Sequence, residues 1–238
     1  MSGSSSRPGV EILEYCETPI GLLCLRRREL LSRPGTVVTE VTLDHEFLMS
    51  SYHTASERAL ASLALGWHGG SDLRVLVGGL GLGYTAHAAL EQSCVERVDV
   101  LELLPQVISW LSRNLVPLGS TLVSEERFRV AEGDIFEHLD SSPETRYDAI
   151  LVDVDHSPDE LLSPGHRSFY TLDGLRRARE HLADGGVLGV WSSAENETFA
   201  RTLEEVFAEV RIETVRWHNE LIDEDQRDDL FLARRRGP

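Results

Sequence analysis

Acidic side chains recur in this chain at the ends of short apolar stretches. Glu102, Asp134 and Asp153 each follow such a stretch, and the last of these stretches, Ala149–Val152, is wholly apolar. Short continuous apolar segments are typical of buried parallel strands. In an open parallel sheet, ligands bind outside the carboxyl ends of the strands. The spacing therefore predicts that these three carboxylates share one ligand site at the edge of a parallel sheet.

A glycine-rich turn precedes the acidic residues and indicates which kind of ligand they bind. Gly79, Gly81 and Gly83 follow an apolar strand, and a helix-compatible run begins at Thr85. Glycines permit a tight turn and a close approach of the backbone to a ligand. The N-terminus of the helix that follows can then present its N–H groups to that ligand.

The distance along the chain from this turn to the first acid suits a nucleoside. Glu102 lies 19 positions after Gly83, and an acid about 20 residues past the turn is placed to accept hydrogen bonds from a ribose diol. Asp134 can accept from an adenine amino group. We assign Leu103 and Ile135, the residues that follow these two acids, to the same cofactor-binding set. The sequence thus predicts an adenosine-type site.

The end of the predicted strand that precedes Asp153, and residues elsewhere in the chain, supply candidates for catalysis. Asp153 can act as a base for an amine, helped where burial raises its pKa, although a helix cap or a turn is the alternative role. Asp155 and Glu57 could bind a cationic acceptor, and His156 could carry a proton. Tyr170 either lines the acceptor pocket or belongs to the core, and no metal site is predicted.

Composition restricts the class of partner. Lys and Arg total 23 against 40 Asp and Glu, a formal charge of −17, which argues against a nucleic-acid partner and is compatible with a cationic small molecule. The three cysteines lack CxxC spacing, so neither a disulfide framework nor a zinc knuckle is expected. No apolar run approaches bilayer length, and the N-terminus lacks a signal-peptide core. We expect a cytoplasmic protein without a membrane partner.

The order of predicted elements gives the fold class. Strands that alternate with helices imply a Rossmann-like, doubly wound, mostly parallel sheet of seven strands. A C-terminal antiparallel hairpin closes the sheet, with strands at Val210–Trp217 and Asp229–Ala233 joined by an acidic loop over Asn219–Asp228. A helix at Phe169–Leu182 is expected to stop at Gly185-Gly186, with a strand at Val187–Trp191 after it.

The N-terminal part of the chain has a different pattern. Turn residues separate three candidate strands, Val10–Tyr15, Gly21–Arg26 and Thr36–Leu43, which suggests a small antiparallel β unit. Such a unit buries little surface alone, so it must pack on the main domain or on a second subunit, as in a homodimer. The expected division is a disordered leader (1–9), the small β unit (10–55) and a cofactor-binding catalytic domain (56–238).

The combination of motifs resembles the spermidine synthase (polyamine aminopropyltransferase) family, which is related to class I S-adenosylmethionine methyltransferases. The similarity extends over nearly the whole chain. It is carried by Val77-Gly-Gly-Leu-Gly-Leu-Gly83 in place of GGGDGG, Val100–Pro105 for E-L-D-P, Gly133-Asp134 for G-D, Tyr147–Pro158 for Y-D-x-I-x-x-D-S-S-D-P, Phe169-Tyr170 for F-Y, and Leu182–Val187 for L-x-x-G-G. Thr18-Pro-Ile-Gly21 and Leu43-Asp44 resemble the family's N-terminal β domain. The resemblance implies S-adenosylmethionine or its decarboxylated form as donor, with S-adenosylhomocysteine or methylthioadenosine as product.

The departures from the family pattern lie on the donor side. Gly81 replaces the turn aspartate that helps bind the amino group of the aminopropyl donor. The position of the family's site tyrosine falls on Ser56, and a Tyr52-His53 pair lies just upstream. Three functions therefore stay open: aminopropyl transfer to an amine, methyl or other alkyl transfer from intact S-adenosylmethionine to a small metabolite, and nucleoside binding without catalysis. The absence of this aspartate favours the second function, because an acid at position 81 would repel the methionine carboxylate of intact S-adenosylmethionine.

Overall fold

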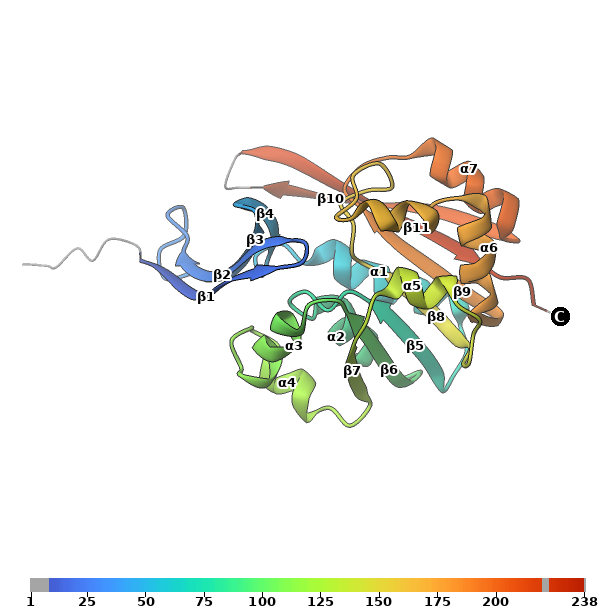
Figure 1. Ribbon diagram of the computed structural model, residues 1–238, viewed down its shortest axis with the longest axis horizontal. Coiled ribbons are helices and arrows are strands. Elements are labelled where there is room, and N and C mark those ends of the chain that lie inside the picture. Colours follow the sequence, from blue (N-terminus) through green and yellow to red (C-terminus); the bar gives the residue numbers. More distant parts are fainter. Residues whose placement is uncertain (1–8, 220–222, 238) are drawn as a thin grey trace, which may run out of the picture.

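The computed structural model describes residues 9–219 and 223–237, and these form two sheets. The smaller is antiparallel and runs in the order β1-β2-β3-β4. Its strands are β1 (Val10–Thr18), β2 (Gly21–Glu29), β3 (Val37–Leu43) and β4 (Glu46–Ser50). In Figure 1 this sheet lies at one end of the molecule, drawn in blue. The predicted leader, 1–9, falls outside the described residues except for Gly9.

The larger sheet has seven strands in the order β10-β11-β9-β8-β5-β6-β7, and β11 alone runs against the others. This confirms the predicted fold class and its antiparallel C-terminal hairpin. The order reverses at the β8–β5 pair, which places the ends of these two strands at the expected ligand position. The strands are β5 (Leu73–Gly78), β6 (Val95–Glu102), β7 (Phe128–Glu132), β8 (Tyr147–Val152), β9 (Leu182–Ser192), β10 (Glu209–Asn219) and β11 (Glu224–Arg234).

Helices cover both faces of the large sheet because successive strand residues point to opposite sides. Val75, Val77 and Leu151 pack in one apolar cluster, whereas Leu76 and Ile150 pack in the other. The first face is covered by α1 (Ala55–His68), α2 (Tyr84–Leu90), α3 (Pro105–Ser112) and α4 (Gly119–Ser124). The second is covered by α5 (Ile135–Asp140), α6 (Leu172–Glu180) and α7 (Glu197–Val206). No helix in the described part of the chain is both long and apolar enough to cross a bilayer.

Several predicted boundaries were wrong, and each error has a local cause. The helix predicted over Phe169–Leu182 ends at Glu180, and Gly185-Gly186 lie inside β9 instead of stopping it. A side chain on Gly186 would come within 2.9 Å of the Ala183 carbonyl oxygen, so these glycines mark an irregularity in the strand. Strand β4 and the short helices α4 and α5 were not predicted, since five or six residues give too little periodicity.

The predicted acidic loop at Asn219–Asp228 is largely strand. Residues from Glu224 onward belong to β11 and pair with β10 along its whole length. Acidic residues are poor strand formers, but here they belong to a two-stranded ribbon of β10 and β11 that extends beyond the rest of the sheet. Residues 220–222 of that loop are outside the described part of the chain.

Candidate active site

The glycine turn follows β5 and brings the backbone of two strands together. Gly79 has φ +89°, and a Cβ on it would collide with the carbonyl oxygen of Asp153. Gly83 has φ +91° and precedes α2, with the side chain of Leu122 against it. Both positions therefore require glycine for conformation and for space. The turn carries the backbone past Asp153 at the point where the strand order reverses.

Glu102 ends β6 and holds the turn in place. Its Oε2 accepts from the Leu80 N–H at 2.8 Å, and its Oε1 accepts from the Leu104 N–H, also at 2.8 Å. The carboxyl is buried, which raises its pKa, while hydrogen bonds from backbone N–H groups act in the opposite direction. This acid is thus tied to the backbone on both sides.

Asp134 has a comparable position after β7. It caps α5 by accepting from the Phe136 N–H at 2.8 Å. Together with Glu102, Leu103 and Ile135 it lines a cavity of about 100 Å³. Binding pockets for small molecules usually measure about 300–1,000 Å³, so this cavity is smaller than a usual binding pocket.

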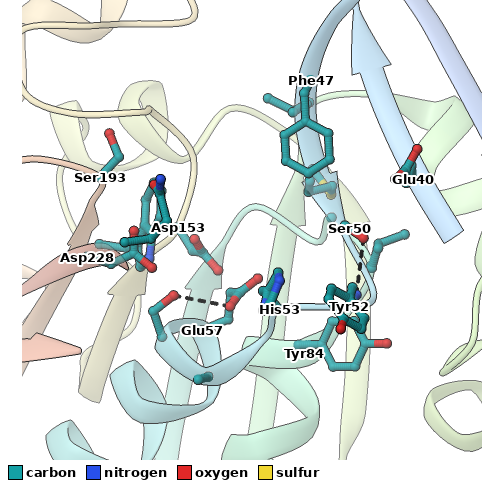
Figure 2. Close-up of a pocket in the computed structure, with 18 of the residues that line it drawn as sticks. Glu40, Phe47, Ser50, Tyr52, His53, Glu57, Tyr84, Asp153, Ser193 and Asp228 are labelled. Carbon is teal, nitrogen blue, oxygen red and sulfur yellow. Dashed lines mark hydrogen bonds between the residues drawn. The ribbon is translucent and has the colours of Figure 1, made fainter. Parts of the chain in front are cut away.

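A larger cavity of about 860 Å³ adjoins the small one. Asp153, Gly81 and Met49 line both, so they lie at the junction. The larger cavity extends between the carboxyl ends of the large sheet and the small sheet, where Phe47 and Glu40 line it (Figure 2). Its volume lies within the range of about 300–1,000 Å³ that is usual for small-molecule pockets.

Three carboxylates gather in the larger cavity, from Glu57 on α1, Asp153 after β8 and Asp228 on β11. Figure 2 shows them on the same side of the cavity. Burial and the neighbouring Asp228 raise the pKa of Asp153 to about 6, and a hydrogen bond from Thr85 partly counters this effect. Burial and the charge of Asp153 raise the pKa of Glu57 to about 8. Burial also raises the pKa of Asp228.

Aromatic rings form another wall of this cavity. His53 stacks on Trp217 with 4.0 Å between ring centroids, and Tyr52 meets His53 edge to face at 4.3 Å. Trp217 also donates from Nε1 to Asp228 Oδ2 at 3.3 Å. Tyr52, His53 and Ser56 all line the cavity. The three upstream positions considered from the sequence therefore face the same space.

Two of the predicted catalytic residues lie elsewhere. Asp155 is only 2% exposed, and its carboxylate accepts from the Leu162 N–H and the Tyr170 hydroxyl and pairs with His166 Nδ1 at 2.7 Å. Neither Asp155 nor Tyr170 lines the large cavity, whereas His156 does. The structure thus groups Asp153, Glu57 and His156, and it places Asp155 and Tyr170 in an internal network that holds the loop after β8. Burial and Asp155 raise the pKa of Tyr170 well above its usual value.

Asp228 and Trp217 were not identified from the sequence. Both lie on the C-terminal hairpin, and Asp228 fell in the region predicted as loop, so nothing suggested that it points into a cavity. Alternation would not have identified it either, because Asp228 and Asp229 are both buried in β11. Among the described residues, no cluster of His, Cys, Asp or Glu has the arrangement of a metal site.

The replacement of the family's turn aspartate has a structural counterpart. A Cβ built on Gly81 would lie 3.0 Å from Met49 Sδ. The thioether of Met49 therefore occupies the space into which an acidic side chain at position 81 would extend. Gly81 also has φ +51°, a region in which Asp is tolerated better than most residues. The junction between the two cavities is apolar at this point.

Comparisons with known proteins agree with this architecture. No family model matches the chain. It is 34% identical to polyamine aminopropyltransferase 2 of Streptomyces coelicolor over 59% of its own length and 24% of the relative. It is also 34% identical to spermine synthase of Arabidopsis thaliana, over 50% of its own length and 31% of the relative. The chain thus spans about a quarter to a third of the length of these two relatives.

The fold has relatives among solved structures. A spermidine synthase crystallised with the transition-state analogue AdoDATO superposes with a TM-score of 0.72 and 17% identity, over 94% of this chain and 73% of that one. At that identity the likeness concerns the fold alone. In sequence the chain is thus similar to polyamine aminopropyltransferases and spermine synthase, and in fold it is similar to spermidine synthase.

Proposed function

We propose that the protein is a transferase that moves an alkyl group from an S-adenosyl sulfonium donor to the nitrogen of a small cationic amine, most simply an aminopropyl group. One observation carries the proposal: Asp153 lines both cavities, the one with Glu102 and Asp134 and the one with the three carboxylates. A base at that junction can face the nitrogen of an acceptor on one side and the donor on the other. The relatives named as polyamine aminopropyltransferases support the same reaction.

The proposed reaction requires one proton transfer and one displacement. The ammonium group of the acceptor gives a proton to the Asp153 carboxylate, which leaves a neutral amine. The amine nitrogen then attacks the carbon next to the sulfonium in line, the C–N bond forms, and the electron pair of the broken C–S bond stays on sulfur as a thioether. Because a pKa of about 6 leaves Asp153 mostly ionised at pH 7, it can accept that proton. Positioning supplies the rest of the rate enhancement.

The residues of the smaller cavity suit the nucleoside of the donor. Glu102 lines this cavity, with backbone N–H groups also directed at its carboxylate, and Asp134 has an oxygen that is not used in capping α5. Gly79 lets the backbone come close. The proposed donor-binding set is Gly79, Gly81, Gly83, Glu102, Leu103, Asp134, Ile135 and Asp153.

A second candidate is transfer from intact S-adenosylmethionine, as in a methyltransferase. The apolar contact between Gly81 and Met49 favours it. Without an acid there, the amino group of a decarboxylated donor has no partner at this position, and a methionine carboxylate meets no repulsion from it.

Calorimetric titration with decarboxylated S-adenosylmethionine, intact S-adenosylmethionine and methylthioadenosine tests both candidates. For aminopropyl transfer we expect the decarboxylated form to bind at least tenfold more tightly than the intact one, and the reverse order would favour methyl transfer. If none of the three binds, both proposals are wrong.

The remaining features are also proposals. We expect residues 10–55 to mediate a homodimer, since Val10, Ile12 and Tyr15 of β1 are all more than half exposed. Light scattering gives the molar mass of the unaltered protein and of an Ile12→Glu variant. If the variant has the same mass as the unaltered protein, this surface does not mediate the dimer. We expect the protein to act in the cytoplasm.

A further inference from the structure

The three carboxylates of the large cavity come from segments far apart in the sequence. Glu57 lies in the first turn of α1, Asp153 follows β8, and Asp228 lies on β11. Each has a neutral hydrogen-bond donor beside it: Ser56 Oγ lies 3.3 Å from Glu57 Oε2, Thr85 donates to Asp153, and Trp217 donates to Asp228. The tertiary fold has thus assembled three acidic groups at one place, each beside a neutral donor.

The basic residues next to these acids pair elsewhere. Arg58 follows Glu57 in sequence but pairs with Glu91 at 3.3 Å. Arg227 precedes Asp228 but pairs with Glu195 and Asp229. The chain contains no lysine, and within the described residues none of the three acids has an ion pair with arginine. The excess of negative charge is therefore open to the cavity.

Other titratable groups surround the three acids. Burial raises the pKa of Asp228, and His53 partly counters this rise. Burial is also the main cause of the raised pKa of Tyr84, to which Glu57 contributes. The other charged or titratable residues lining this cavity are His156, Arg26, Arg28, Glu40 and Tyr52. Arg26 and Arg28 both pair with Glu40, at 2.9 and 2.7 Å, so this distant end carries a net charge of about +1 by the usual charge states.

We propose that Glu57, Asp153 and Asp228 act as one unit in which Glu57 holds a proton until an ammonium group binds and releases it on binding. The inference rests on the proposed function, because it takes the acceptor to be a cationic amine. The step balances: the Glu57 carboxyl loses one proton to solvent, the unit gains one negative charge, and the ammonium group supplies one positive charge. Glu57 would thus adjust the charge of the site to that of its ligand.

The electrostatic environment supports this assignment. Burial and the like charges of neighbouring acids disfavour the ionisation of all three acids at neutral pH in the empty site. Glu57 is the acid with the most strongly raised pKa, about 8, against about 6 for Asp153. At pH 7 Glu57 is therefore neutral in the empty site. An ammonium group nearby favours the ionised form and lowers that pKa, so a proton leaves.

Calorimetry in two buffers with different ionisation enthalpies counts the protons released when 1,4-diaminobutane binds. For the unaltered protein we expect release of about 0.9 proton at pH 7, the fraction protonated at a pKa of about 8. The value should fall toward zero by pH 9. Glu57→Gln, which mimics the neutral acid, should bind the diamine and release about 0.1 proton at pH 7, the share left to Asp153.

Two further variants make the result interpretable. Glu204→Gln removes a charge on the exposed side of α7 and should release as many protons as the unaltered protein. Asp228→Asn removes one of the like charges beside Glu57 and should shift the release to lower pH. Circular dichroism checks that each variant is folded.

The outcomes separate the two proposals. If the protein binds the diamine and Glu57→Gln releases as many protons as the unaltered protein, Glu57 is not the exchanging group, while the proposed transferase function stands. If release persists at pH 9, the proton comes from the amine and the inference is wrong. If the unaltered protein binds no diamine, the amine acceptor and this inference both fail.

Discussion

The two sides of the site, the smaller and the larger cavity, both contain carboxylates, but in different surroundings. Glu102 is buried, but backbone N–H groups of Leu80 and Leu104 surround its carboxylate. Glu57 and Asp228 are also largely buried, yet their neighbours include other carboxylates. One acid has its charge stabilised by local dipoles, whereas the others lie among like charges.

This difference separates a structural use of a carboxylate from a chemical one. A carboxylate that accepts several backbone hydrogen bonds orders the loop around it. Carboxylates that repel each other have raised pKa values and so can exchange protons near neutral pH. The two sides meet at Asp153, which has a hydrogen bond from Thr85 but also the charge of Asp228 nearby.

The largest expected effect comes from Asp153→Asn. The amide cannot accept a proton from the acceptor, so kcat should fall by about 10²–10⁴-fold, the usual contribution of a general base. Affinity for methylthioadenosine should change by no more than a few-fold, because the shape is kept. Steady-state kinetics and calorimetry measure the two effects. A rate close to that of the unaltered protein would remove Asp153 from the mechanism.

Glu102→Ala should have the next largest effect. The substitution leaves the buried N–H groups of Leu80 and Leu104 without their acceptor, and we expect a loss of about 2–4 kcal/mol in the free energy of unfolding. Urea denaturation measures it. Glu132→Ala is the matched control, since this residue pairs in register with Glu102 at the end of the neighbouring strand but is exposed. Equal losses in both variants would contradict the role of Glu102 in holding the turn.

An effect of comparable size should appear in the pH dependence of stability. The pKa of Glu57 is about 8 in the folded protein and near 4.5 when unfolded. Between these values the folded state binds a proton that the unfolded state does not, so stability falls as pH rises from about 5 to 8. Relative to Glu57→Gln, the unaltered protein should lose about 3.5 kcal/mol over that range. If the difference in unfolding free energy between the unaltered protein and Glu57→Gln is the same at pH 5 and pH 8, the raised pKa of Glu57 is ruled out.

The smallest effect is expected for Tyr170→Phe. Its hydroxyl donates to Asp155 at 3.0 Å, outside the large cavity. Loss of that bond should reduce stability by about 1 kcal/mol and leave kcat/KM within about twofold. A thermal melt and steady-state kinetics test this, and a rate loss of tenfold or more would return Tyr170 to the active site.

The fold was largely predictable because its signals are local. The apolar run Val75–Val77 and the run Ala149–Val152 identify buried strands directly, and the glycine turn after the first one indicates a helix to follow. Strand β4, five residues long, lacks such a signal. The acidic start of β11 has a composition typical of loops and becomes strand only through its pairing with β10.

The site was predictable only in part. Strand-end residues such as Glu102, Asp134 and Asp153 follow from the rule that parallel strands end at one edge. Asp155 lies two residues beyond Asp153, but the chain turns inward there and the Tyr170 hydroxyl and His166 take up its carboxylate. No local pattern distinguishes these two orientations.

The sequence by itself determined the sheet, the glycine turn and the acids at its edge, because each depends on the hydrophobicity and conformational freedom of neighbouring residues. The tertiary structure alone decided which distant groups meet. It brings Asp228 beside Glu57 and Asp153, and it places Met49 against Gly81. Such contacts depend on how the small sheet and the C-terminal hairpin close over the strand ends, and the resulting burial, together with the proximity of like charges, sets the proton affinity of the site.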